Sequence, residues 1–268
     1  MRRFTPVLGF VVLAAAVGIT ACSRGASSPG EARLYDPAAL PTGALGKSIA
    51  YGHDIVVDTQ RTMNGYVRAR MNCAACHIDA GTKPKGGSFA GTYARFPQWN
   101  ARAKRVIALQ DRIAECFLYS MNGRPPAYYS REMVAVVAYI AWLSRGTPVG
   151  ATRSSDGYIV PLPKASPNLT NGARLYAADC AACHGASGAG VSGAFPPLWG
   201  AASFNAGAGM AHLDRMTGFV HSNMPKNAPG SLSLADAYDV SAWVLTHHRP
   251  QFGRTVEVES SPRPAGYF

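Results

Sequence analysis

The sequence predicts an all-α fold made of two similar halves. Three observations support this prediction: a short cysteine–histidine motif that occurs twice, an apolar stretch with helical periodicity near the end of each half, and the lack of convincing period-two alternation. At 268 residues, the chain is long enough for two domains of about 100 residues each, together with a leader and tails.

The repeated motif is Cys-Ala-Ala-Cys-His, which stands at residues 73–77 and again at residues 180–184. A helix-compatible stretch precedes each copy, and a loop rich in glycine and proline follows it. The two copies therefore mark one structural unit that occurs twice. Residues 147–167, which separate the units, contain four prolines and little periodicity, as is typical of a linker.

Each half closes with a predicted apolar helix. In the first half this helix covers residues 131–144, and Ser130 is its expected N-cap. In the second half it covers residues 234–247, and Ser233 with Asp236 has the pattern of a capping box.

The chain is basic, with 26 Lys and Arg against 15 Asp and Glu and a formal net charge of +11. The basic residues are scattered and no recognition motif accompanies them, so we expect no nucleic-acid partner. The charge is either a solvated basic surface or a field that attracts small anions or an acidic partner protein.

The first residues have the pattern of an export leader. Arg2 and Arg3 precede an apolar run over residues 7–19, which is too short to span a bilayer comfortably. Residues 19–22 resemble the lipobox of bacterial lipoproteins, which predicts cleavage before Cys22, acylation of this cysteine and a lipid-anchored protein in the periplasm. The alternative is ordinary leader cleavage, with Cys22 incidental.

The repeated motif predicts two covalently attached haems of the c type. Two cysteines three positions apart can each form a thioether with one haem, and the adjacent histidine can reach the iron. A redox dithiol or half a zinc site would use the same cysteine spacing. The following histidine, the duplication and the leader favour haem over both alternatives.

These signals divide the chain into six expected segments. They are a lipoprotein signal peptide at 1–21, a flexible tether at 22–42, a first cytochrome c domain at 43–146, a linker at 147–167, a second cytochrome c domain at 168–250 and a tail at 251–268.

In the second half, Met224 is the best candidate for the sixth iron ligand. It lies in an Asn-Met-Pro sequence in a predicted loop ahead of the closing helix, and the following proline stiffens the approach. Met210 and Met216 are its rivals, and a lone methionine is often only a core residue.

The first half has no methionine at the equivalent place, and it offers Cys116 instead. This cysteine has no obvious partner, because the other five belong to the lipobox or to the two motifs. On a helix, Arg112, Cys116 and Ser120 would share one stripe, which suits iron ligation and anion binding. The simpler interpretation is an inert buried thiol. In an exported chain an unused thiol is an oxidation liability, which favours a function.

With these features, the chain resembles the dihaem thiosulfate dehydrogenases over roughly residues 51–251. Members of this family oxidise two thiosulfate ions to tetrathionate and pass two electrons through the haems to an outside acceptor; some run the reaction in reverse. The resemblance rests on sequences at 80–84, 93–98, 116–123, 223–225, 232–233, 239–242 and 249–250.

The resemblance implies roles for individual residues. The first, catalytic haem would be attached to Cys73 and Cys76, with His77 and Cys116 as axial ligands. The second, electron-transfer haem would be attached to Cys180 and Cys183, with His184 and Met224 as axial ligands. The substrate positions would be Arg112 and Ser120, with Arg102 as the best match for a second arginine and Arg95 as its rival.

One residue departs from the family pattern. Some members carry a lysine immediately before the methionine, and this lysine can replace the methionine on the iron. Asn223 occupies that position here, which puts such a switch in doubt, and Lys226 lies beyond Pro225.

The chemistry of the substrate agrees with these roles. Thiosulfate is a dianion, and arginine forks suit sulfonate oxygens as they suit phosphate. A thiolate ligand predicts a low potential for the first haem and a methionine predicts a higher potential for the second, so electrons would leave through the second haem toward an acceptor such as a small cytochrome c. The alternatives are a sulfur-carrying cytochrome of the SoxA kind and a non-catalytic electron-transfer lipoprotein.

Overall fold

The computed structural model describes residues 34–151, here called the first half, and residues 158–252, called the second half. The described residues belong to a single unit that begins at Leu34. The predicted signal peptide, Cys22 and most of the C-terminal tail lie outside the described residues. Within them, no helix is both long enough and apolar enough to cross a membrane.

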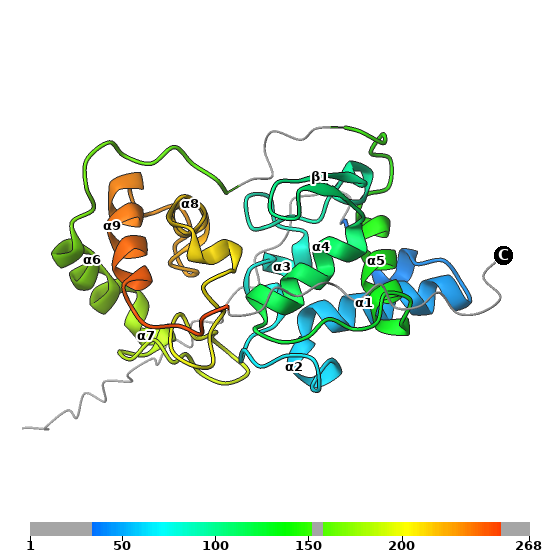
Figure 1. The fold of residues 1–268 in the computed structure, drawn as a ribbon, viewed down its shortest axis with the longest axis horizontal. Helices are drawn as coiled ribbons and strands as arrows, with labels where there is room; N and C mark the ends of the chain where they lie inside the picture. Colours follow the sequence, from blue (N-terminus) through cyan, green and yellow to red (C-terminus); the bar gives the residue numbers. More distant parts are fainter. Residues whose placement is uncertain (1–33, 152–157, 253–268) are drawn as a thin grey trace, which may run out of the picture. The chain divides into compact units, whose positions relative to one another are not determined.

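The first half is mainly helical (Figure 1). Its elements are α1 (Ala44–Val57), α2 (Thr59–Thr62), α3 (Ile78–Gly81), strands β1 (Gln98–Asn100) and β2 (Arg105–Ile107), α4 (Leu109–Glu115), a π-helical turn (Cys116–Ser120) and α5 (Arg131–Leu143). Three short 3-10 turns lie at Pro37–Ala39, Cys73–Ala75 and Tyr93–Arg95.

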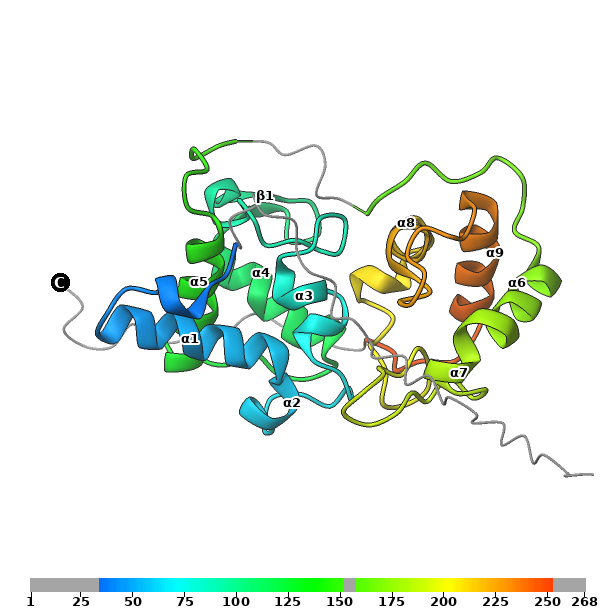
Figure 2. The same ribbon diagram turned by 180° about the vertical axis from the view of Figure 1, so that it is seen from behind.

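The second half is helical, with turns and one isolated β-bridge between Val191 and Phe195, within the residues described (Figure 2). Its elements are α6 (Leu169–Leu175), a π-helical turn (Tyr176–Cys180), α7 (Ala181–His184), a 3-10 turn (Gly209–Ala211), α8 (Leu213–Asn223) and α9 (Leu234–Leu245).

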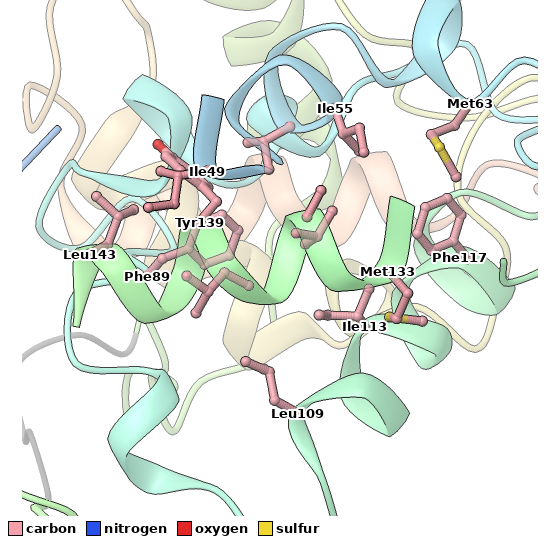
Figure 3. Packing of buried hydrophobic residues seen from close by; sticks show 14 of the residues in the cluster. Ile49, Ile55, Met63, Phe89, Leu109, Ile113, Phe117, Met133, Tyr139 and Leu143 are labelled. Carbon is pink, nitrogen blue, oxygen red and sulfur yellow. The ribbon is translucent and has the colours of Figure 1, made fainter. Parts of the chain in front are cut away.

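In the first half, α1 crosses α5 at a glycine. A Cβ atom added to Gly52 would lie 2.0 Å from the carbonyl oxygen of Ala135 and 2.8 Å from the Cβ of Tyr139. Only glycine therefore permits this close approach of the two helices. The buried side chains of Ile49, Tyr139 and Leu143 pack beside the crossing (Figure 3).

The second half repeats this arrangement with α6 and α9. A Cβ atom added to Gly172 would lie 2.3 Å from the carbonyl oxygen of Asp239 and 2.8 Å from the Cβ of Trp243. In both halves a glycine on the opening helix thus meets two residues one turn apart on the closing helix. The internal repeat read from the two motifs is confirmed at the level of helix packing.

Both closing helices begin where the sequence predicts. The Ser130 hydroxyl accepts a hydrogen bond from the Met133 amide at 3.2 Å, and the Ser233 hydroxyl accepts one from the Asp236 amide at 3.0 Å. The predicted capping box is incomplete, because the Asp236 carboxylate accepts a hydrogen bond from the Ser233 hydroxyl at 2.7 Å. The all-α prediction, with two similar helical halves, is confirmed apart from one short hairpin.

The expectation that the chain forms no strand is wrong for one short hairpin. Strands β1 and β2 pair in antiparallel register, with Trp99 opposite Val106. The Asn100 side chain builds the turn, because its Oδ1 accepts hydrogen bonds from the amides of Arg102 and Ala103, both at 2.9 Å. Strands of three residues are too short to produce a recognisable alternation.

Candidate functional site

A cavity of about 960 Å³ lies at the second repeated motif, and Cys76 of the first motif also lines it. It is near the upper end of the size range of small-molecule and cofactor sites. The four residues expected to hold the second haem all line this cavity: Cys180, Cys183, His184 and Met224. The rest of the lining includes apolar side chains such as Phe204 and Phe219. The donor set and the apolar lining therefore fit a covalently attached haem.

Met210 and Met216 line the same cavity, so the lining does not by itself exclude them as ligands. They differ from Met224 in position. Met210 lies in a 3-10 turn and Met216 within α8, whereas Met224 follows the last residue of α8 with an extended backbone. This placement matches the loop position expected for the ligand.

His184 is oriented by the backbone of Pro196. Its Nδ1 atom lies 2.9 Å from the Pro196 carbonyl oxygen. A carbonyl accepts only, so Nδ1 carries the proton and Nε2 is left to bind a metal. Burial lowers the pKa of His184, so its ring is held in the neutral form that a metal needs.

His77 in the first motif has the same kind of support. Its Nδ1 donates to the carbonyl oxygen of Gly87, and its ring stacks on Phe89 with the centroids 4.2 Å apart. Burial lowers the pKa of His77 to about 4. Gly87 has a φ of +68°, and a Cβ atom there would lie 2.6 Å from the Cys76 carbonyl oxygen. The loop that orients His77 therefore requires glycine.

Cys73 of the first motif is held by Thr59. Its buried hydroxyl accepts a hydrogen bond from the Cys73 amide at 2.9 Å and donates one to the Ile55 carbonyl at 2.7 Å. Burial, with a smaller contribution from the charge of Cys116, raises the pKa of Cys73 to about 11 and that of Cys76 to about 12.

Cys116 stands at the junction of α4 with the π-helical turn. Its carbonyl accepts a hydrogen bond from the Met121 amide at 2.9 Å, which is an i+5 contact. Such wide turns often occur at functional sites. The prediction that Arg112, Cys116 and Ser120 share one stripe is therefore only partly right. Arg112 lies one α-helical turn before Cys116, but the wider π-helical spacing after Cys116 moves Ser120 around the helix axis.

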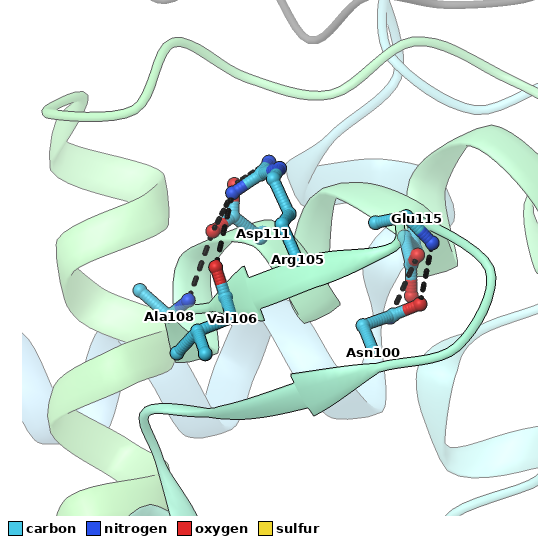
Figure 4. Close-up of polar contacts among 7 residues, drawn as sticks. Asn100, Arg105, Val106, Ala108, Asp111 and Glu115 are labelled. Carbon is cyan, nitrogen blue, oxygen red and sulfur yellow. Dashed lines mark hydrogen bonds and ion pairs between the residues drawn. The ribbon is translucent and has the colours of Figure 1, made fainter.

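Arg112 is held by its neighbour Glu115. Its Nη1 donates to Glu115 Oε2 at 2.9 Å, and its side chain is 45% exposed. The charge of Cys116, and then that of Glu115, raises the pKa of Arg112 further above its usual range. Asn100 donates to the other oxygen of the same carboxylate, Oε1, at 3.1 Å (Figure 4). The guanidinium is therefore a fixed positive charge beside the thiol.

The other two predicted substrate arginines contact different residues. The Arg102 guanidinium lies 4.2 Å from the centre of the Tyr119 ring and donates to the Gly207 carbonyl at 2.9 Å. It is therefore next to the residue that precedes Ser120. The Arg95 guanidinium donates to the Thr92 hydroxyl at 3.0 Å. These contacts favour Arg102 over Arg95 as the second arginine of the site.

The sequence analysis missed Tyr158, which belongs to the predicted linker. A Cβ atom added to Gly218 of α8 would lie 1.6 Å from the Tyr158 carbonyl oxygen, so the linker backbone packs directly on that helix. Burial raises the pKa of Tyr158 to about 12, and the charges of Cys76 and Arg112 also act on it. The glycine within α8 is the sequence feature that permits this contact.

Two family models match successive parts of the chain. Residues 64–149 match the model of the SoxA/TsdA cytochrome c domain, and residues 167–244 match that of the cytochrome c oxidase, cbb3-type, subunit III. The two matches cover the two repeated motifs separately, in agreement with one covalently bound haem c in each of two cytochrome c domains.

Similar proteins with known names agree with the family models. The chain is 42% identical to a thiosulfate dehydrogenase of Allochromatium vinosum, over 88% of this chain and 91% of that protein, and 38% identical to one of Stutzerimonas stutzeri, over 93% and 85%. The solved structure of a thiosulfate dehydrogenase (TsdBA) from Marichromatium purpuratum superposes with a TM-score of 0.77 at 35% identity. The match covers 82% of this chain and half the length of the solved chain. The chain belongs to the thiosulfate dehydrogenase family of c-type cytochromes.

Proposed function

We propose that this chain oxidises two thiosulfate ions to one tetrathionate ion and passes the two electrons to an external acceptor. The observation that carries the proposal is the position of Cys116 at the junction of α4 with the π-helical turn, one helical turn after the Arg112 guanidinium that Glu115 holds. A non-catalytic electron carrier has no use for this combination of a free thiol and a guanidinium.

The chain's own residues would hold the two haems in different ways. In the first half, Cys73 and Cys76 would attach the haem, and His77 and Cys116 would be the ligands of its iron. In the second half the corresponding residues are Cys180, Cys183, His184 and Met224. Each haem, when bound, supplies an iron that accepts or gives up one electron.

The substrate residues would gather two dianions that repel each other. Arg112 and Arg102 supply positive charge with forked donors, and Ser120 supplies a hydroxyl. A sulfur–sulfur bond forms between two thiosulfate ions, which together lose two electrons; no proton is taken up or released. The soft Cys116 thiolate suits the soft outer sulfur of thiosulfate.

The setting of the reaction follows from the same features. The enzyme is a periplasmic protein, and the predicted acylation of Cys22 would anchor it to a membrane. The electrons would leave through the second haem to a small cytochrome c or a similar acceptor, because a methionine ligand raises the potential of that haem relative to the first.

The test is chemical. The purified holoprotein, mixed with thiosulfate and ferricyanide, should form tetrathionate and pass two electrons to ferricyanide for each tetrathionate. The intact mass of the protein should exceed that of the mature polypeptide by two haems. A sulfur-carrying cytochrome would leave sulfur bound to a partner protein and no free tetrathionate. Absence of tetrathionate with this protein alone would replace the enzyme proposal by that carrier function.

A further inference from the structure

The side chain of Asn223 connects the two halves at the ligand loops of both haems. It is fully buried at the last position of α8, directly before Met224. Its Nδ2 donates to the Lys85 carbonyl oxygen at 2.8 Å and to the Phe219 carbonyl oxygen at 3.1 Å. The first of these hydrogen bonds joins residues 138 positions apart in the sequence.

The loop that receives this hydrogen bond is the loop that orients His77. Three successive carbonyl groups of the loop have separate partners. That of Lys85 accepts from Asn223, that of Gly86 accepts from the Ile78 amide at 2.8 Å, and that of Gly87 accepts from His77 Nδ1. A short chain of bonds therefore runs from Met224 through Asn223 and this loop to His77.

Close packing fixes the contact. A Cβ atom added to Gly86 would lie 3.3 Å from Asn223 Oδ1 and 3.1 Å from the Cβ of Ile78, so the loop backbone lies directly against the amide. Within the described residues, Asn223 Oδ1 is buried and has no hydrogen-bond partner. An unpaired buried acceptor is unfavourable, so the two hydrogen bonds that the Asn223 amide donates must offset this cost.

We infer that Asn223 is a positioning residue for electron transfer between the two haem sites. Its amide fixes the Met224 end of the second site against the His77 loop of the first and supplies the hydrogen bond in a bonded path between them. In each transfer one electron leaves the first haem site, which is oxidised, and reaches the second, which is reduced, and no covalent bond forms or breaks. The inference rests on the proposed roles of His77 and Met224 as iron ligands.

Electron transfer in the oxidised holoprotein without thiosulfate tests this inference. A light pulse with an external photoreductant introduces one electron, and absorbance follows its redistribution between the two haems. Asn223→Leu keeps the approximate size of the side chain and removes the donor, and Asn223→Ala removes both. We expect the redistribution to be slower in both variants than in the unchanged protein, because the hydrogen bond that joins the two loops is lost.

The matched control is Lys85→Asn. This change removes the exposed charge but keeps the backbone carbonyl, and asparagine tolerates the φ of +57° at this position. It should leave the redistribution rate unchanged. The methionine–iron absorption band should be retained in all three variants.

Two results would overturn the inference. One is an unchanged redistribution rate in both Asn223 variants. The other is loss of the fold or of the methionine–iron band in both, which would give Asn223 a purely structural role in its own loop. Because no thiosulfate is present, neither result depends on whether the protein forms tetrathionate.

Discussion

Arg112 and Cys116 lie one turn apart where α4 passes into the π-helical turn, and Cys116 is the main group that raises the Arg112 pKa. The thiolate is the form of a cysteine that binds iron and reacts with sulfur, and Arg112 places a permanent positive charge one turn away from this one. The same charge attracts a dianionic substrate. One pair of residues can therefore serve both the haem and the substrate.

Removal of the Arg112 charge should weaken the interaction with thiosulfate. We expect Arg112→Ala to lower kcat/KM by about tenfold to a hundredfold, which corresponds to the loss of a charged hydrogen bond of about 1.5–3 kcal/mol. Steady-state kinetics with ferricyanide measures this change. Lysine restores the charge but not the fork, so Arg112→Lys should recover only part of the activity.

Arg105 provides the matched control for Arg112. It pairs with Asp111 at 3.1 Å near the beginning of α4, and its side chain is 53% exposed (Figure 4). Arg105→Ala should leave kcat/KM unchanged and lower the free energy of unfolding by about 1 kcal/mol or less. An equal kinetic loss in the two variants would mean that only the overall positive charge matters.

Met224 should be the sixth ligand of the second haem. Met224→Gly should abolish the methionine–iron absorption band and lower the potential of that haem, because the thioether favours the reduced iron. Thiosulfate binding should be largely retained. Met216→Leu is the control, since Met216 lines the same cavity within α8. If the band is lost in the control and kept in Met224→Gly, Met216 is the ligand.

The sequence predicted the features that depend on residues close together along the chain. Local patterns with a known physical cause include the two motifs and the N-caps Ser130 and Ser233. They also include Cys116, the cysteine that belongs to neither motif nor to the lipobox. The π-helical turn was not predicted, because the prediction used the spacing of an α-helix. That spacing would place Ser120 in line with Cys116.

The remaining site features depend on contacts between distant residues. Two contacts join segments far apart in the sequence: the hydrogen bond from Asn223 to Lys85 and the packing of Tyr158 on Gly218. A single sequence does not indicate which distant residues meet in the fold. In the sequence, Asn223 stands out only because it departs from the family pattern. In the structure, this residue is buried and donates a hydrogen bond to Lys85 in the first half.

The glycine at the α1–α5 crossing should be essential for stability. Gly52→Ala places a methyl group 2.0 Å from the Ala135 carbonyl oxygen, so the helices must separate. We expect the free energy of unfolding of the holoprotein to fall by about 1–3 kcal/mol, as for other overpacked cores. Chemical denaturation measures this value. Gly65→Ala is the control, because the nearest atom to its added Cβ is 3.8 Å away, on the flexible Arg124 side chain.

The N-terminal cysteine should decide where the protein resides. Cys22→Ser removes the proposed acylation site, and the protein should then move from the membrane fraction to the soluble periplasmic fraction. Ser23→Ala, next to it in the sequence, should not change the distribution. Native protein that is freely soluble and begins at another residue would show that the lipobox is incidental.

The most informative single change is Cys116→Met. Methionine is also an iron ligand, so the variant should keep both covalent haems, as checked by intact mass, and should show a second methionine–iron contribution in its spectrum. If the Cys116 thiolate only adjusted the potential of the iron, much of the turnover would remain. We expect the opposite: a loss of turnover of about a hundredfold or more, the size seen when a group that stabilises the transition state is removed. Retained tetrathionate formation in this variant would place the reaction elsewhere and reduce Cys116 to a ligand. Thiosulfate titrations should still show binding, because Arg112 is unchanged, so the loss would appear mainly in kcat rather than in KM.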